Sequence, residues 1–323
     1  MRRQRRDAIG MAAGMAADMA FGDPRRGHPV AVFGAAAAAA ERRLYRDSRP
    51  SGAVFAAAGV VAAVVAGGLA GRAGTPGVAA VTFSAVGGTT LCRVGGRIAD
   101  ALDAGDLDGA RAMLPSLVGR DPSLLDEAGI CRAAVESIAE NTSDATVAPL
   151  LWGAAAGASG LAGYRAVNTL DAMIGYRSPR YLRFGWGAAR LDDAANLIPA
   201  RVTAALAGVL SGHPIRAARA VHRDAGRHPS PNAGVVEAAF AGALGISLGG
   251  RTVYPHGVED RPVLGEGRVP QAADLRAAVR LSRRVQVASA VLAVVVRAGV
   301  SGRSGGPAAR RPRRRGWSRR PRR

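Results

Sequence analysis

Residues 53–71 form a run of nineteen amino acids without a charged side chain. A helix needs about twenty predominantly apolar residues to cross the hydrocarbon core of a bilayer. Because only helices and closed barrels satisfy all their backbone groups in lipid, this run predicts a membrane-spanning helix. Residues 73–92 are also uncharged, with Pro76 near their start. We interpret the two runs as a helical hairpin that turns at residues 72–77.

The composition is typical of close helix packing in a membrane. Apolar residues make up 48% of the chain, but aromatic residues only 4%, and there are 43 glycines. Small residues let helices approach closely in lipid. Alternating strand patterns are scarce. We therefore predict an all-α fold, a polytopic integral membrane helical bundle with a short extramembrane helical segment at about residues 96–135.

The basic charge is concentrated at the two ends of the chain. All 44 basic residues are arginine, which excludes lysine-dependent chemistry such as a Schiff base. Residues 1–6 carry four arginines and residues 302–323 carry ten, so these fourteen account for most of the net charge of +20. Arg-rich ends predict cytoplasmic termini and an even number of crossings, for which four is our expectation.

We interpret the chain as one membrane-embedded domain over residues 1–301, followed by a disordered Arg-rich tail over residues 302–323. Solvated basic tails are typical of segments that lie on anionic lipid. The sequence has no basic surface interleaved with aromatic residues. We therefore expect no nucleic-acid partner.

Three carboxylates stand before an apolar segment in the middle of the chain. Glu136, Glu140 and Asp144 are spaced i, i+4 and i+8, which places them roughly on one face of a helix. Like charges at this spacing repel each other, so the stack predicts a compensating cation, either an arginine or Mg²⁺. A solvated acidic face is the alternative interpretation, which the uncharged sequence at residues 145–164 disfavours.

A second polar group follows that apolar segment. Acid, amide and guanidinium side chains together suit a site that holds phosphate through a metal and through arginine forks. Polar contacts between the helices of a membrane bundle explain the same spacing equally well. The residues of this group are Asn168, Asp171, Arg190, Asp192, Asp193, Asn196 and Arg201.

Several longer motifs, in a fixed order, resemble one known family. They are residues 22–24 (GDP), 28–30 (HPV), 136–144 (ESIAENTSD), 148–150 (APL), 164–176 (YRAVNTLDAMIGY), 184–193 (FGWGAARLDD), 198–201 (IPAR) and 228–234 (HPSPNAG). Over roughly residues 18–296 the chain resembles the CobD/CbiB family, the adenosylcobinamide-phosphate synthases of cobalamin biosynthesis. Arg165 and Arg177 stand where that family usually has lysine, in keeping with the Arg-only composition.

The resemblance implies a multi-pass enzyme of the cell membrane. Such an enzyme joins aminopropanol phosphate, or a similar amino-alcohol phosphate, to a propionate of (adenosyl)cobyric acid and yields (adenosyl)cobinamide phosphate. This amide formation depends on ATP and Mg²⁺. The implied partners are the corrinoid, the amino-alcohol phosphate and the lipid bilayer, with other cobalamin-biosynthesis enzymes as further candidates. The alternatives are a membrane transporter or channel subunit that uses intramembrane carboxylates, and a membrane scaffold.

The resemblance also suggests roles for the matched polar residues, which we state as hypotheses. The candidate catalytic carboxylates are Glu140, Asp144, Asp192 and Asp193. The candidate Mg²⁺ ligands are Glu136, Glu140, Asp144 and Asp192. The candidate substrate-binding residues are His28, Asn141, Asn168, Asp171, Arg190, Asn196, Arg201 and Asn232.

Overall fold

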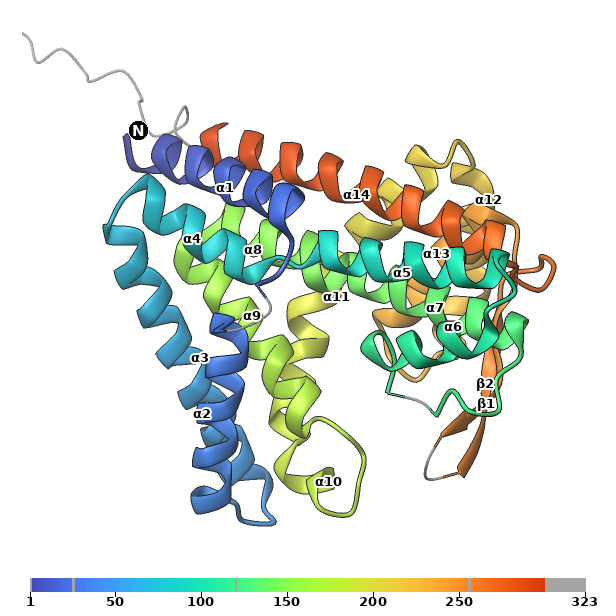
Figure 1. Ribbon diagram of the computed structural model, residues 1–323. Helices are drawn as coiled ribbons and strands as arrows, with labels where there is room; N and C mark the ends of the chain where they lie inside the picture. The colour runs from blue at the N-terminus through green and yellow to red at the C-terminus, as the bar shows by residue number, and fades with distance from the viewer. Residues whose placement is uncertain (1, 25–26, 120, 255–256, 300–323) are drawn as a thin grey trace, which may run out of the picture.

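The computed structural model describes residues 2–24, 27–119, 121–254 and 257–299 of the chain (Figure 1). The predicted disordered tail at residues 302–323 lies outside the described residues. Within them the fold is almost entirely helical, as predicted from the sequence. The first half contains α1 (Arg2–Phe21), α2 (Pro29–Leu44), α3 (Arg49–Arg72), α4 (Thr75–Ala85), α5 (Gly88–Asp103), α6 (Leu107–Met113), the 3₁₀ turn η1 (Leu114–Ser116) and α7 (Glu127–Thr142).

The second half of the chain adds more helices and one pair of strands. Its elements are the π-helical segment η2 (Ser143–Val147), α8 (Ala148–Ala156), α9 (Ala158–Ile174), α10 (Tyr181–Phe184), α11 (Trp186–Leu210), α12 (Pro214–Asp224), the 3₁₀ turn η3 (Ala225–Arg227), α13 (Ala233–Leu244), strands β1 (Leu248–Tyr254) and β2 (Gly257–Leu264), and α14 (Ala272–Gly299). In Figure 1, α1, α4 and α14 cross the top of the molecule, while α2 and α3 run down its left side.

Helix α3 has the features of a membrane-spanning helix. Ser48 caps its N-terminus by accepting a hydrogen bond from a backbone N–H in the first turn, and Gly74, at a φ of 86°, follows its C-terminus. Its outward face is apolar, with Val54 70% and Val61 60% exposed. By length and composition, α3 and the segment Thr75–Asp103 are the two helices of the described residues that could cross a membrane.

The segment after α3 differs from the predicted helical hairpin. The chain does turn after Arg72, but α4 is separated from α5 by two non-helical residues. Figure 1 shows α4 and α5 leading away from α3 at a wide angle rather than returning along it. Gly77 permits a tight turn, because a Cβ there would lie 1.9 Å from the carbonyl oxygen of Ala70. The hairpin prediction was therefore right about the turn and wrong about the packing.

The largest hydrophobic core surrounds α7. Ile130 and Ile138 of this helix are fully buried, and they belong to one cluster with Phe240 of α13 and Leu275 of α14. A helix that is buried on nearly every side needs small or apolar residues all round. α7 meets this need with alanines and a cysteine between its larger side chains. The predicted extramembrane segment at residues 96–135 contains the end of α5, α6, η1 and the start of α7.

The antiparallel hairpin of β1 and β2 is an element that the sequence did not predict. Leu248 pairs with Leu264 and Gly250 with Arg261, with an irregularity between these two pairs. Gly249 and Gly250 have φ values of 78° and 79°, a region that side chains rarely adopt. Glycines and charged residues interrupt the period-two pattern on which strand prediction depends.

A buried ion pair joins the two ends of the described chain. Arg297 of α14 donates a hydrogen bond of 2.6 Å to Asp7 of α1, and their side chains are 10% and 5% exposed. The same guanidinium donates to the carbonyl oxygens of Ala154 and Ala155 at the end of α8. α1 and α14 run side by side in Figure 1. This contact holds the first and last helices against the end of α8.

Candidate active site

Polar side chains from five parts of the chain line one cavity of about 550 Å³. They come from α7 with η2, from α9 and the loop after it, from α11, from the loop before α13 and from β2. The lining holds five carboxylates against two arginines, and we call this space the acidic cavity. Seven predicted site residues line it: Glu140, Asp144, Asp171, Asp192, Asp193, Asn196 and Asn232.

Asp144 lies in the π-helical segment η2. Pro149, four residues after Ala145, has no N–H to donate to the Ala145 carbonyl. That carbonyl instead accepts the backbone N–H of Gly87 at 3.0 Å. π-helical turns of this kind rotate the side chains that follow them, and they occur frequently at functional sites. Asp144 lies in this segment and lines the cavity together with Glu140, one turn earlier.

A second proline acts in the same way in α11. Pro199 lies inside this helix and cannot donate to the carbonyl of Ala195. The free carbonyl accepts the indole N–H of Trp152 at 3.0 Å. Asp192 and Asn196 lie on the turns of α11 just before this proline. A proline thus removes one backbone hydrogen bond near Asp144 and another near Asp192, and a neighbouring element satisfies each freed carbonyl.

Side-chain amides hold the two carboxylates that these helices present. Asn196 donates to Asp192 at 3.0 Å and accepts a hydrogen bond of 2.9 Å from the hydroxyl of Tyr164. Asn168 of α9 donates to Asp144 at 3.4 Å. The two polar halves of the sequence, around Asp144 and around Asp192, therefore meet in space.

Burial and mutual repulsion make these carboxylates hard to ionise. Burial raises the pKa of Asp144 well above its usual range, and the charges of Asp192 and Glu140 raise it further. Burial also raises the pKa of Asp192. For Asp171, burial and the carboxylates of Asp192 and Asp193 raise the pKa to about 7. All these groups lie outside the two candidate spans. A bound cation would relieve the repulsion.

A second cavity, of about 590 Å³, adjoins the acidic cavity. Its charged lining consists of four arginines and one carboxylate, with aromatic side chains between them, and we call it the arginine cavity. The two cavities share Tyr176, Arg177, Asp193 and His228. The arginines are Arg49, Arg177, Arg190 and Arg201, and the aromatic residues are Tyr176, Tyr181 and Trp186.

Arg201 fastens the loop before α13 to α11. Its guanidinium donates to the side-chain oxygen of Asn232 at 2.7 Å and to the carbonyl of Pro231 at 3.2 Å. The amide of Asn232 donates in turn to the backbone carbonyl of Asp193 at 2.8 Å. This chain of hydrogen bonds fixes the wall between the two cavities.

Four predicted site residues line neither cavity. Glu136 is buried, where its Oε1 accepts the backbone N–H of Gly249 at 2.8 Å and its Oε2 lies 3.8 Å from Arg261. It thus fastens the β-hairpin to α7 and does not extend the acid stack into the cavity. Asn141 donates back to Ser137 on its own helix. Asn168 contacts Asp144 from outside the lining.

His28, the fourth of these residues, caps a helix. Its Nδ1 accepts the backbone N–H of Val30 at 3.2 Å at the start of α2. Its Nε2 lies 3.8 Å from a carboxylate oxygen of Asp23. Burial lowers the pKa of the imidazole. A substrate contact for His28 stays a prediction.

Several residues that the structure brings to the site were not among the predicted site residues. Arg261 of β2 and His228 line the acidic cavity, with 3.1 Å between the guanidinium Nη2 and the imidazole Nε2. Burial lowers the pKa of His228, and the charge of Arg261 lowers it further. Arg177 and Tyr176 stand between the cavities. In the sequence, the motif at residues 228–234 and the pair Tyr176–Arg177 were the signals from which a site role for these residues could have been predicted.

The donor set of the acidic cavity suits a hydrated magnesium ion. No group of three or more His, Cys, Asp or Glu side chains in the described part of the chain is arranged to hold a metal by itself. Mg²⁺, however, typically binds one or two carboxylates, keeps several waters and completes its shell with substrate phosphate. Oδ1 of Asp192 is buried without a hydrogen-bond partner among the described residues, and Asp144 lies beside it. This pair fits such an ion.

Comparisons with known proteins identify relatives of the chain. A family model described as CobD/Cbib protein matches residues 11–282. The cobalamin biosynthesis protein CobD of Mycobacterium tuberculosis is 56% identical over 299 residues, which cover 90% of this chain and 95% of the relative. The CobD proteins of Rhodobacter capsulatus and Geobacter metallireducens are each 43% identical, over 85% and 86% of this chain and 92% and 93% of their own lengths. No solved structure matches with comparable significance. The chain therefore belongs to the CobD/CbiB family.

Proposed function

We propose that this protein is an enzyme of cobalamin biosynthesis that forms an amide between a propionate of (adenosyl)cobyric acid and aminopropanol phosphate or a similar amino-alcohol phosphate. Its relatives carry the name of cobalamin biosynthesis proteins. The observation that carries the proposal is the adjoining pair of cavities of opposite charge. ATP-dependent amide formation brings a metal–nucleotide complex, a carboxylate and a second phosphate to one place. The metal ion needs an acidic lining, and the anionic groups need a lining of arginines.

In this proposal Asp144 and Asp192 hold a hydrated Mg²⁺. Asn168 and Asn196 orient them through the hydrogen bonds described above. Bound Mg²⁺ would neutralise part of the phosphate charge of ATP, and ATP would activate the substrate carboxylate as a mixed anhydride. Glu140 adds a further negative charge at the cavity wall and favours retention of the cation.

The arginine cavity holds the anionic groups of the substrates. Guanidinium groups bind phosphate and carboxylate through paired N–H donors, and they stay charged at any physiological pH. Among the described residues, Arg190 and Arg177 have no partner as close as the one that Arg201 finds in Asn232. We therefore assign phosphate binding to Arg177 and Arg190, and assign Arg201 to positioning the wall.

Asp171 accepts a proton from the ammonium group of the amino alcohol. An amine attacks an activated carboxyl group only after it has lost its extra proton. A general base works best when its pKa lies near the working pH. Asp171 lines the acidic cavity, and its pKa of about 7 meets that condition.

We further propose that the enzyme is a multi-pass protein of the cell membrane. α3 and the segment Thr75–Asp103 have the length and composition of spans. Large apolar side chains are also exposed on other helices, including Ile198 of α11 at 70% and Val295 of α14 at 61%. Soluble monomers rarely expose so much apolar surface, whereas lipid would cover it.

Reconstitution of the purified full chain in vesicles tests the activity. Adenosylcobyric acid, ATP, Mg²⁺ and either aminopropanol phosphate or ethanolamine phosphate are supplied, and each is left out in turn. We expect amide product only in the complete mixture. The amino-alcohol phosphate that gives the higher rate of product formation is the preferred substrate. Absence of product with both amines, together with solute flux into the vesicles, would instead favour a transporter.

A further inference from the structure

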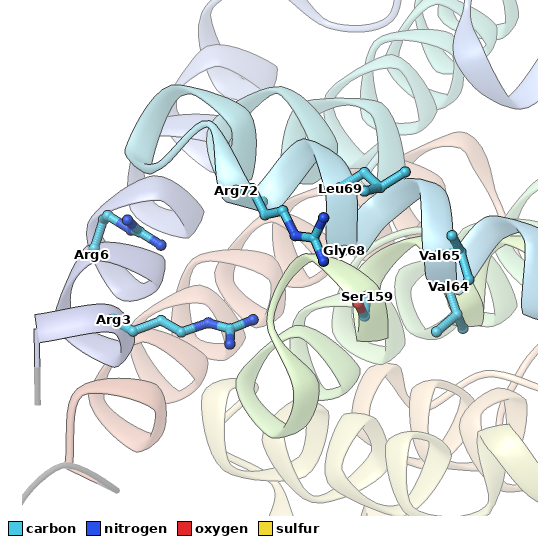
Figure 2. A pocket seen from close by; sticks show the side chains of 9 residues that line it. Arg3, Arg6, Val64, Val65, Gly68, Leu69, Arg72 and Ser159 are labelled. Atoms are coloured by element: carbon cyan, nitrogen blue, oxygen red, sulfur yellow. The ribbon is translucent and has the colours of Figure 1, made fainter.

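Three arginines meet in a groove far from the candidate active site. Arg3 and Arg6 extend from α1, and Arg72 ends α3; Figure 2 shows their guanidinium groups directed toward the same space. The groove has a volume of about 550 Å³ and contains no acidic residue in its lining. The nearest acid of α1, Asp7, is already paired with Arg297.

The positive charge of this groove is not neutralised within the described residues. Nε of Arg6 is buried without a hydrogen-bond partner there. α1 also begins with four arginines among its first five residues and has no acid in its first turn. The N-terminus of a helix carries partial positive charge, so cations at this end are unfavourable. An anion bound in the groove would offset both effects.

The floor of the groove is apolar. Val64, Val65 and Leu69 of α3 line it beside Gly68 and Ser159 (Figure 2). Val65 and Leu69 are 54% and 52% exposed, and with Val61 they form a stripe at i, i+4 and i+8 along the outward face of α3. The cations thus stand at the end of an apolar stripe on a candidate membrane span.

We propose that this groove binds one anionic phospholipid, with its phosphate between Arg3, Arg6 and Arg72 and an acyl chain along the outward face of α3. The arginines followed by an apolar stripe match the charged headgroup and apolar acyl chains of a phospholipid at the edge of a bilayer. Guanidinium forks suit its phosphate. Gly68 lets α3 pack closely against the start of α9 at the floor of the groove, since a Cβ there would lie 2.9 Å from the hydroxyl of Ser159. The proposal is independent of the catalytic activity.

The test uses the full chain in a neutral detergent. Thermal unfolding and native mass spectrometry are recorded with phosphatidylglycerol, with phosphatidylcholine and with inorganic phosphate. The groove variant is Arg3→Gln/Arg6→Gln/Arg72→Gln. The matched control removes the same charge from exposed arginines outside the groove, as Arg219→Gln/Arg280→Gln/Arg283→Gln.

We expect phosphatidylglycerol to raise the unfolding midpoint of the wild type and of the control, and to be retained as one bound lipid. The groove variant should bind it roughly tenfold more weakly or worse, because each arginine near an anionic lipid contributes to binding. Equal losses in the two triple variants, or equal stabilisation by inorganic phosphate, would overturn the proposal. If the groove variant does not fold, equal retention of the two lipids by the wild type would also overturn it.

Discussion

Asp171→Asn should stabilise the protein in the absence of substrates, although it removes the proposed general base. The carboxylate of Asp171 lies in a cavity with four other carboxylates and is partly buried. Burial and the charges of Asp192 and Asp193 raise its pKa from the ordinary 3.8 to about 7. The folded protein therefore holds a proton that the unfolded chain would release. Asparagine keeps the shape of the side chain but carries no charge at any pH.

The pH dependence follows from this shift. Below about pH 4 the carboxyl is protonated in both the folded and the unfolded state, so its ionisation does not lower the free energy of unfolding. Between pH 4 and 7 the unfolded chain is ionised and the folded protein is not, so stability falls as pH rises. A shift of about three units at about 1.4 kcal/mol per unit sets a ceiling of about 4 kcal/mol above pH 7. Solvent screening of the partly exposed group lowers the expected gain to about 2 kcal/mol.

Unfolding of both proteins in detergent, between pH 4.5 and 8.5 and without Mg²⁺ or nucleotide, measures the effect. The advantage of Asp171→Asn should grow from pH 4.5 to about 7 and then stay constant. Asp108→Asn, at an exposed carboxylate of α6, serves as the control and should show no such trend. An Asp171→Asn variant that is no more stable than the wild type at pH 8 would refute the view that burial and charge repulsion in the acidic cavity destabilise the folded protein.

Three further unfolding experiments test other parts of the structure. Arg297→Gln should cost about 3 kcal/mol or more, because it leaves the carboxylate of Asp7 buried and unpaired; the double variant Asp7→Leu/Arg297→Met should recover much of this loss. Gly52→Ala should cost about 3 kcal/mol, since its Cβ would lie 1.7 Å from a backbone oxygen of α10, whereas Gly96→Ala, with open space around it, should stabilise α5 by about 0.5–1 kcal/mol. Mg²⁺ should raise the unfolding midpoint of the wild type at pH 8 more than that of Asp192→Asn, and an equal rise would argue against a metal site.

The helices could be predicted from the sequence because their signals are local. Residues 53–71 lack charge over a full helix length, and the structure places them in α3. The packing of α4 and α5 was not predictable in this way, because the direction of a chain after a turn depends on contacts with distant helices. The hairpin of β1 and β2 was missed for a similar reason. It is held by Glu136, more than a hundred residues earlier in the chain, which accepts the N–H of Gly249.

The candidate site was partly visible in the sequence. Regular spacing correctly brought Glu140 toward one cavity, but Glu136 on the preceding turn faces the β-hairpin. Spacing alone could not show the π-helical segment that contains Asp144, because its backbone depends on Pro149 and on a distant partner, Gly87, for the carbonyl that this proline frees. Arg261 was beyond reach, since its strand was not predicted.

The central claim is that the acidic cavity is the centre of amide formation, and single-turnover assays of its carboxylates test this most directly. Asp144→Asn and Asp192→Asn, reconstituted with saturating adenosylcobyric acid, aminopropanol phosphate, ATP and Mg²⁺, should form adenosylcobinamide phosphate roughly 100-fold more slowly than the wild type or worse. The control Asp108→Asn should react at the wild-type rate. Near-normal product formation by both cavity variants would contradict the assignment.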